Sequence, residues 1–457
     1  MSFRKKIYSL SPLVLKSVLA DLYTIKESKH RYSGLDLISH MYRDDILELK
    51  KTRLSDHLLA ANGCEYWNEY FKKNGITIDD IITEPFKVYE TLPILNKWDV
   101  VGQESQFVNR GIDKKELRKI STSGSTGGAL NFYETKISEL ERWGVWWRYR
   151  ERLGIKKEMR LAYFGGKSIV PIGNVNPPYW VGGIFSNQLN FSVYHISMEN
   201  IELYVNEINK FAPEWIHGYP SALYAIAKLS KEKGIKVTCS VKYITIGSES
   251  LLDYQKELIE SFFGVSVKQH YGLSESVANI SEDLEGNLVV DEEFSLVDFV
   301  QIGSEGLYRI IGTNWSNPAF PLLKYDTGDI AYSTCQNLDV FQKKRFVQRI
   351  DGRIEDYLLL PDGRMIGRVA EVAKNIEGIV ESQIYQYSDY SIDIRLVTQY
   401  EESFYDEKKI KNTLKAKIGD SIEINIVFVD KIEKTANGKH RFLISEVRNE
   451  ANSSRHG

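Results

Sequence analysis

A run of hydroxyl and glycine residues over 121–128 is the stretch of this chain best suited to bind an anion. Five hydroxyl side chains are interleaved with three glycines, so O–H donors and unobstructed backbone N–H groups can converge on one phosphate. The phosphate-binding candidates are Ser121, Thr122, Ser123, Gly124, Ser125, Thr126 and Gly127. We call residues 121–128 the Ser/Gly loop. Composition alone also fits a flexible linker, whereas the lysine-bearing nucleotide loop is not indicated, because no lysine follows until Lys136.

Four further positions carry charged side chains in glycine-containing motifs. Glu275 ends the run Tyr-Gly-Leu-Ser-Glu, and Asp329 ends Tyr-Asp-Thr-Gly-Asp. Arg353 and Lys439 each follow a glycine directly. Taken alone, each has an ordinary explanation, because most Glu and Lys side chains are solvated surface groups and Gly-Asp pairs are common in turns.

The composition is that of an ordinary globular protein. Of 457 residues, 42% are hydrophobic and 26% charged, so we expect two or three lobes, at about 100–200 residues per domain. The net charge of −3 predicts no preference for nucleic acid or membrane surfaces. No apolar run of about 18 residues occurs, and Pro12 and Lys16 interrupt the apolar core that a secretion signal needs. We therefore expect no membrane insertion.

The cysteines give no sign of a metal site or a disulfide framework. Cys64, Cys239 and Cys335 lie far apart, form no C-x-x-C pair and are odd in number. This usage predicts a reducing, cytoplasmic location.

The elements before and just after the Ser/Gly loop read as helices and one short strand. Residues 1–100 show helical spacing of apolar residues, 130–133 reads as a strand, and 138–153 as a helix. On that helix Trp143, Trp146 and Trp147 share one face, being spaced i, i+3 and i+4. They are either core aromatics or one wall of an organic-acid pocket.

From residue 160 the pattern becomes that of an α/β lobe. Helices are expected at 222–233 and 251–263 and a strand at 241–246, which favours largely parallel pairing. Glycine-rich segments at 164–167 and 180–184 fall at strand ends, where open α/β sheets bind ligands. Residues 294–348 read as mostly β, with turns expected at Gly303, Gly306 and Gly312.

The last part of the chain reads as a separate α+β lobe. A hairpin turn is expected at 361–363, a helix at 368–376, strands at 383–387 and 392–397, a helix at 406–417 and a strand at 423–429. The pattern indicates a compact unit of about 100 residues joined by one crossing.

The motifs in this order, together with the His-Gly-Tyr-Pro-Ser run at 217–221, resemble the adenylate-forming superfamily. The match is to its phenylacetate–CoA ligase-like group, and most to the CapK-type members linked to capsular polysaccharide biosynthesis. The resemblance implies an α/β protein: a large N-terminal domain over 1–352, with α/β sheets and a β subdomain, and a small mobile α+β domain over 353–457. It also implies two steps, in which a carboxylate attacks the α-phosphorus of ATP and a thiol, amine or hydroxyl then displaces AMP.

The resemblance also implies where the nucleotide binds. The Ser/Gly loop would hold the β- and γ-phosphates, although Ala129-Leu130 replaces the usual Pro-Lys pair after its glycines. Asp329 would accept hydrogen bonds from the ribose hydroxyls, since one carboxylate offers two oxygens to a diol. Gly247, Ser248 and Glu249 would line the adenine through backbone groups, and Tyr271, whose motif also contains Gly272 and Ser274, would stack on it.

Three residues would have catalytic roles by the same resemblance. Glu275 would coordinate Mg²⁺, a hard cation that prefers oxygen ligands. Arg353 would reach the ribose and phosphates from the lobe boundary, with Glu355 in the hinge position that is usually aspartate. Lys439 would bridge the substrate carboxylate and the α-phosphate, where positive charge offsets the repulsion of two anions.

The acid, the acceptor and the oligomeric state stay open, a homodimer being one option. The acceptor is CoA in the best-known relatives, whereas an amine or amino-sugar would suit surface-polysaccharide assembly. Aromatic residues near the strand ends are candidates for the acid pocket: Phe164, Tyr179, Trp180, Tyr219 and His270. A non-catalytic nucleotide-binding or scaffold protein of the same fold is the alternative. A hydrolase is a weaker third option, because no G-x-S-x-G motif occurs.

Overall fold

The structure is a computed structural model. It describes residues 12–42, 45–122, 130–302, 306–334, 338–353, 358–362, 365–366, 376–420, 422–434 and 440–447.

The N-terminal part is helical, as the apolar spacing predicts. Its helices are α2 (Leu13–Tyr32), α3 (Gly34–Met41), α4 (Ile46–Asn62), α5 (Glu65–Lys73), α6 (Ile78–Thr83) and α7 (Pro85–Thr91), followed by the short 3₁₀ turns η1 (Lys97–Asp99) and η2 (Glu104–Phe107). Asp45 caps the N-terminus of α4, because its side chain accepts hydrogen bonds from the backbone N–H groups of Leu47 and Glu48. Trp67 of α5 is buried in a cluster with Phe107 and Phe320, so these helices pack on the later β part.

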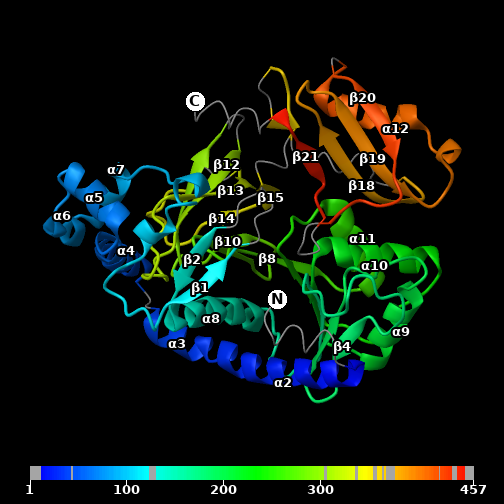
Figure 1. Cartoon of the computed structure of the whole chain (residues 1–457), viewed down its shortest axis with the longest axis horizontal. Coiled ribbons are helices and arrows are strands. Elements are labelled where there is room, and N and C mark those ends of the chain that lie inside the picture. The colour runs from blue at the N-terminus through cyan, green and yellow to red at the C-terminus, as the bar shows by residue number, and fades with distance from the viewer. Residues whose placement is uncertain are drawn as a thin grey trace.

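A nine-stranded sheet forms the centre of the molecule (Figure 1). Its order is β14-β10-β9-β8-β7-β6-β3-β5-β4. The bounds are β3 (Leu161–Phe164), β4 (Trp180–Gly182), β5 (Gln188–Phe191), β6 (Trp215–Gly218), β7 (Tyr243–Gly247), β8 (Val267–Gly272), β9 (Asn279–Glu282), β10 (Leu288–Val290) and β14 (Phe346–Val347). The run β8-β7-β6-β3-β5 is parallel, and the outer pairs are antiparallel. The expected parallel α/β lobe is therefore present.

Helices cover the parallel strands on both faces (Figure 1). On one face lie α9 (Ile201–Phe211), α10 (Pro220–Glu232) and α11 (Asp253–Phe263), which bury apolar residues such as Ile216 and Ile246. On the other lies α8 (Lys136–Arg152), whose Trp147 packs with Trp215 of β6. Helix α2 also contributes to this second layer, because Asp21 accepts hydrogen bonds from the backbone N–H groups of residues 183–185, next to β4.

Helices α3 and α8 cross with their backbones in contact. A Cβ atom added at Gly34 would lie 2.2 Å from the Leu140 carbonyl oxygen, and one at Gly144 would lie 2.3 Å from the Gly34 carbonyl oxygen. No side chain larger than hydrogen fits at this crossing. The two glycines therefore set how closely the N-terminal helices approach α8.

A β subdomain follows the central sheet in the chain. It is a four-stranded antiparallel sheet in the order β11-β12-β13-β15, comprising β11 (Leu296–Gln301), β12 (Leu307–Thr313), β13 (Tyr325–Tyr332) and β15 (Arg349–Arg353). A turn at Gly306 is confirmed by its φ of +86°. The turn predicted at Gly312 is wrong, because Gly312 lies within β12, where an added Cβ would meet the Val277 carbonyl oxygen at 2.0 Å. Gly303 lies outside the described residues.

The C-terminal unit has its own sheet and core, as predicted. Its four strands lie in the order β20-β19-β18-β21, with β18 (Ile379–Gln386), β19 (Ile392–Thr398), β20 (Ile424–Phe428) and β21 (Leu443–Ser445), packed with α12 (Glu407–Ile418) after the turn η5 (Glu402–Phe404). Strands β16 (Leu358–Leu359) and β17 (Met365–Ile366) pair antiparallel on either side of the turn predicted at 361–363, of which residue 363 lies outside the described residues. The helix predicted at 368–376 falls outside the described residues except for its last position.

Among the described residues, the helices include none whose length and apolarity would carry it through a bilayer.

Candidate functional site

Three adjacent parallel strands end in glycine at the same edge of the central sheet. Strand β6 ends at Gly218, β7 at Gly247 and β8 at Gly272. Gly218 pairs with Ile246, and Gly247 pairs with His270, so the three ends are neighbours in space. The structure thus brings together the segments 217–221, 247–249 and 271–275, which the sequence analysis had singled out separately. Carboxyl ends of parallel strands are where open α/β sheets bind ligands.

Tyr271 links this edge to the β subdomain. Its hydroxyl donates to Oδ2 of Asp329 over 2.7 Å, although 58 residues separate the two in sequence. Burial raises the pKa of Tyr271 well above its ordinary value, and the Asp329 and Glu275 carboxylates raise it further. Tyr271 is therefore a neutral donor that orients the Asp329 carboxylate. Opposite Asp329 in the ladder lies Arg353 of β15, of which only the backbone is described.

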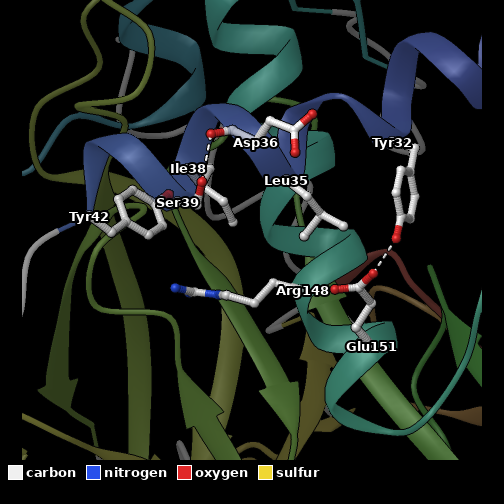
Figure 2. Close-up of a pocket in the computed structure, with 8 residues that line it drawn as sticks. All are labelled: Tyr32, Leu35, Asp36, Ile38, Ser39, Tyr42, Arg148 and Glu151. Carbon is white, nitrogen blue, oxygen red and sulfur yellow. Dashed lines mark hydrogen bonds between the residues drawn. The ribbon is translucent and has the colours of Figure 1, made fainter.

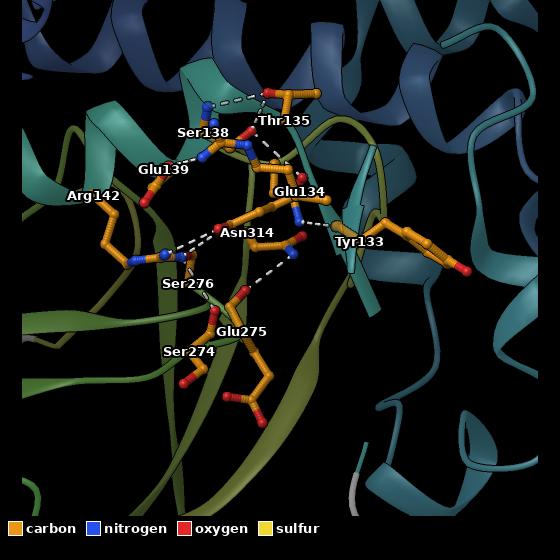
Figure 3. Close-up of polar contacts among 12 residues, drawn as sticks. Tyr133, Glu134, Thr135, Ser138, Glu139, Arg142, Ser274, Glu275, Ser276 and Asn314 are labelled. Carbon is orange, nitrogen blue, oxygen red and sulfur yellow. Dashed lines mark hydrogen bonds and ion pairs between the residues drawn. The ribbon is translucent and has the colours of Figure 1, made fainter. Parts of the chain in front are cut away.

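The loop that carries Glu275 is attached to α8 and to the β subdomain (Figure 3). Arg142 of α8 pairs with Glu134 at 2.7 Å and donates to the Ser274 carbonyl and the Ser276 hydroxyl at 3.4 and 3.2 Å. The Asn314 amide donates to the Glu275 carbonyl over 3.1 Å. Figure 3 shows the Glu275 side chain directed away from these contacts. The backbone is thus anchored while the carboxylate projects from it.

The C-terminal unit meets the strand edge at Glu249. One carboxylate oxygen accepts from the Ser221 backbone N–H at 3.1 Å, and the other accepts from the His440 backbone N–H at 3.3 Å. Ser221 lies in the first turn of α10, whose N–H groups favour a carboxylate. Burial raises the pKa of Glu249. His440 directly follows Lys439 in the chain, so the residue after the Gly-Lys pair lies beside the segment 247–249.

The base of the Ser/Gly loop is a hairpin. Strands β1 (Arg118–Ser121) and β2 (Asn131–Glu134) pair so that Ser121 faces Asn131. The Thr122 N–H donates to the Leu130 carbonyl at 2.9 Å, and the Thr122 hydroxyl accepts from the Leu130 N–H at 3.0 Å. Several predicted site residues lie outside the described residues: Ser123, Gly124, Ser125, Thr126, Gly127 and Lys439.

The aromatic candidates for an acid pocket divide between the two faces of the sheet. Phe164, Tyr179 and Trp180 belong to the apolar cluster that packs with α9, α10 and α11. Their assignment to a pocket is therefore not supported, because Phe164 and Tyr179 are core residues with no more than 2% exposure. His270 lies on the α8 face, where its Nε2 contacts the Asn279 side chain at 2.9 Å and its ring stacks on Tyr149.

That α8 face carries a polar layer that the sequence analysis missed. Tyr163, His217 and Thr245 are in register across β3, β6 and β7, and Thr245 Oγ1 contacts His217 Nδ1 at 2.9 Å. Over it lies Arg150 of α8, with its guanidinium carbon 5.1 Å from the Trp215 ring. A signal was present, because Arg150 continues the tryptophan spacing at i+7 from Trp143. The helix face that carries the three tryptophans therefore carries a cation as well.

A cleft of about 420 Å³ lies apart from these groups, between α3 and α8 (Figure 2). It is lined by Tyr32, Leu35, Asp36, Ile38, Ser39, Tyr42, Arg148 and Glu151. Arg148 is paired with Asp291 at 3.0 Å and with Glu293 at 3.1 Å, and Tyr32 donates to Glu151. Arg148 and Tyr32 are thus paired within the protein, the buried Tyr42 donates to Glu141 over 3.0 Å, and none of the predicted site residues lines the cleft.

Comparison with known proteins supports the resemblance inferred from the motifs. Residues 358–446 match the CapK C-terminal domain family. The chain is 27% identical over 456 residues to Protein CapK of Staphylococcus aureus, covering 97% of this chain and 99% of that protein. It is 25% identical over 185 residues to the phenylacetate-coenzyme A ligase of Thermus thermophilus, covering 38% of this chain and 41% of the ligase.

Solved structures share the fold. A 2-hydroxyisobutyryl-CoA ligase in its postadenylation state, in complex with R3-HIB-AMP, superposes with a TM-score of 0.63 at 14% identity, covering 89% of this chain and 92% of the ligase. An anthranilate CoA ligase in complex with anthranoyl-AMP gives a TM-score of 0.51 at 14% identity, covering 83% of this chain and 72% of that one. The expected adenylate-forming α/β fold and the CapK-type resemblance are both confirmed.

Proposed function

We propose that this protein is an ATP-dependent ligase that activates a carboxylic acid as an acyl-adenylate, releases pyrophosphate, and transfers the acyl group to an acceptor. The observation that carries the proposal is the meeting of four separate motifs at one strand edge: residues 247–249, Tyr271 with Asp329, Glu275, and the backbone of His440 beside Lys439. The relatives named above as CoA ligases, two of them bound to acyl-adenylates, support the same reaction class.

The proposed mechanism begins with two anions that must approach one another. The Ser/Gly loop would bind the β- and γ-phosphates through hydroxyl and backbone donors. Asp329, oriented by Tyr271 over 2.7 Å, would accept from the ribose hydroxyls. The ammonium of Lys439 would bridge the substrate carboxylate and the α-phosphate, where a compact charge stabilises the transition state most in a closed site. Arg353, opposite Asp329 in the ladder, would add positive charge beside the nucleotide.

Mg²⁺ fits the chemistry of this edge. Glu275 offers one carboxylate on an anchored backbone, and a magnesium ion held by one protein carboxylate takes its remaining ligands from phosphates and water. The ion would neutralise phosphate charge as the pyrophosphate leaves.

For the acceptor of the acyl group we propose two classes of molecule. The phenylacetate-coenzyme A ligase relative favours CoA. The CapK-type resemblance of the motifs is our reason for also proposing a role in surface-polysaccharide assembly, where an amine or amino-sugar would serve as acceptor. We propose the domains as 1–352 and 353–457, with the second acting as a lid that brings Lys439 to the site.

The first half-reaction can be tested without knowing the acceptor. ATP–pyrophosphate exchange with a panel of aryl, aliphatic, hydroxy and amino acids, in Mg²⁺ and without CoA, should reveal one responsive acid class. Lys439→Ala should lower that exchange at least about a thousandfold while leaving ATP binding within a few-fold, because removal of one transition-state charge costs several kcal/mol. The matched control is Lys431→Ala, an exposed lysine paired with Glu433 at 2.6 Å, which should exchange normally.

Near-normal exchange by Lys439→Ala would remove this lysine from the mechanism. Silence of the wild-type protein across the whole panel, with ATP still bound, would favour the alternative of a non-catalytic nucleotide-binding or scaffold protein.

A further inference from the structure

Three cations gather on the α8 face of the central sheet. They are Arg31 of α2, Arg150 of α8 and Lys167, which follows β3. We call these three residues the cation cluster. Burial lowers the pKa values of Arg150 and Lys167, and the nearby charge of Arg31 lowers both further. A single carboxylate, Glu27, accompanies them among the described residues, at 3.3 Å from Arg31.

Arg150 is the centre of the cluster and lacks an anionic partner in the described parts of the chain. Its guanidinium carbon lies 5.0 Å from the Trp147 ring and 5.1 Å from the Trp215 ring, and its side chain has no described hydrogen bond or ion pair. Burial lowers its pKa to about 10. Aromatic faces attract such a cation but do not replace the hydrogen bonds and the counter-charge that it loses on leaving water.

Other arginines with largely buried side chains, among the residues that the structure describes, have carboxylate partners. Arg53 lies 2.8 Å from Glu141, Arg142 lies 2.7 Å from Glu134, and Arg345 lies 2.7 Å from Glu292. Arg148, two positions before Arg150 on the same helix, has two carboxylate partners. The chain thus supplies carboxylates where an arginine has a purely structural role, and Arg150 stands apart from that pattern.

The side chains around Arg150 supply no compensating negative charge. Burial, together with the nearby Arg150 charge, lowers the pKa values of His217 and His270 to about 3, so both rings are neutral at pH 7. Burial raises the pKa of Tyr163, which is therefore neutral as well. The Nε atom of Arg31 is itself buried with no hydrogen-bond partner among the described residues. Net positive charge and unused donors therefore remain in this layer.

The cation cluster lies on the same sheet face as the proposed adenylation site. Tyr163, His217 and Thr245 are in register across three strands, and Gly247 is two residues beyond Thr245, so it faces the same side. An acid whose reacting carboxylate meets ATP at the strand ends would extend its other end along this face, beneath α8 and toward Arg150.

We propose that the cation cluster binds a second anionic group on the substrate acid, so that the substrate is a dianion such as a short dicarboxylate. Arg150 provides the planar donor pair that suits a carboxylate, and Arg31 and Lys167 add charge around it. This assignment rests on the proposed adenylation of a carboxylic acid and narrows its substrate class.

The test compares acids that differ only in the charge of the far end. Pyrophosphate exchange is measured with succinate and glutarate, with their monomethyl esters, and with butanoate and pentanoate. We expect kcat/KM to be at least about 100-fold higher for the dicarboxylates, and Arg150→Met to remove that preference while changing the rate with the esters less than about threefold. Arg150→Lys should recover part of the preference. The matched control is Arg152→Met, an exposed arginine on the same helix, which should behave as wild type.

Stability separates a substrate-binding role from a structural one. An unpaired cation costs free energy in the folded state, so Arg150→Met should melt at the same temperature as wild type or higher. A fall of several degrees would show that Arg150 supports packing instead, and would overturn the proposal.

The remaining outcomes distinguish this inference from the proposed function. Exchange that is equal or faster with the uncharged-tail acids would overturn the inference and leave adenylation standing. Exchange with none of these acids would overturn the inference, and only silence across the wider panel of acids as well would count against the proposed function. Titration calorimetry of succinate alone, against wild type and Arg150→Met, then tests the cation cluster by itself, and equal or absent binding overturns it.

Discussion

The contact between Tyr271 and Asp329 joins two of the motifs at the level of single side chains. The resemblance implies that the tyrosine ring stacks on the adenine, which stays a prediction. The structure adds that its hydroxyl donates over 2.7 Å to Asp329, the carboxylate that we propose for the ribose. The raised pKa of Tyr271 keeps the proton on the phenol over the working pH range. A neutral donor can hold Asp329 without competing for its charge.

This contact gives the first residue-scale prediction. Tyr271→Phe keeps the ring and removes the hydroxyl, so it should raise the KM for ATP about tenfold, because a hydrogen bond to a charged group is worth about 1.5–3 kcal/mol. The turnover number should change less than about threefold. Steady-state kinetics with varied ATP measures both. Tyr308→Phe, on the neighbouring strand β12, is the control. An unchanged KM in Tyr271→Phe would show that Asp329 does not depend on this contact.

Helix α8 is the element that organises the site. Its Gly144 sets the crossing with α3, its Arg142 anchors the loop of Glu275, and its Arg150 lies over the polar layer. Arg31 reaches the same region from α2, with its guanidinium carbon 4.1 Å from the ring of Trp143 on α8. One helix therefore fixes the spacing between the proposed magnesium ligand and the cation cluster.

The glycine crossing makes an element-scale prediction. Gly144→Ala should lower the melting temperature by several degrees, because the added Cβ would lie 2.3 Å from the Gly34 carbonyl oxygen and overpacking costs about 1–3 kcal/mol. The direction of the change in melting temperature is informative, since a Gly→Ala substitution inside a helix otherwise stabilises the protein by about 1 kcal/mol. Differential scanning calorimetry measures the shift. Gly173→Ala, where an added Cβ meets nothing within 4 Å, should leave the melting temperature unchanged. A melting temperature that rises in Gly144→Ala would refute the close crossing.

At the scale of the whole molecule, Glu249 joins the C-terminal unit to the central sheet. Its two oxygens accept from N–H groups 28 and 191 residues away in sequence, one on each part of the protein. A second contact between the same parts runs from Gln399 to Glu232 at 2.5 Å. These contacts hold His440, the residue after Lys439, against the edge of the central sheet where β7 ends.

This junction predicts a dependence of stability on pH. Burial raises the folded-state pKa of Glu249 above its ordinary value of 4.5. The stability that the protonated side chain contributes is therefore complete below pH 4.5 and is lost as pH rises through the raised pKa. The side chain of the Glu249→Gln variant cannot ionise, so the variant should not lose stability in this way as pH rises. We therefore expect the melting temperature of the variant, relative to wild type, to increase from pH 4.5 toward pH 7. Calorimetry at several pH values measures the difference. A difference that is constant or falls with pH would contradict a buried, hard-to-ionise carboxylate.

The sequence by itself determined the local features and the chemical inventory. Helical spacing in the first 100 residues, the helix bearing three tryptophans, the parallel α/β lobe and the C-terminal α+β unit all follow from periodicity, which depends on neighbours within a few residues. The order of the glycine-containing motifs was enough to indicate the resemblance to adenylate-forming ligases, because residue identity and order are properties of the chain itself.

Only the tertiary structure decided which side chains meet. Phe164, Tyr179 and Trp180 were candidates for the acid pocket, and the sheet places them on its other face, because residue type alone does not tell which face of a strand a helix will cover. Gly312 was expected to mark a turn but lies within a strand. Glycine is needed there because the backbone of Val277 approaches too closely for any side chain. The pairing of Tyr271 with Asp329 and the gathering of Arg31, Arg150 and Lys167 join residues far apart in the chain. Such contacts depend on the packing of whole layers, which no local pattern encodes.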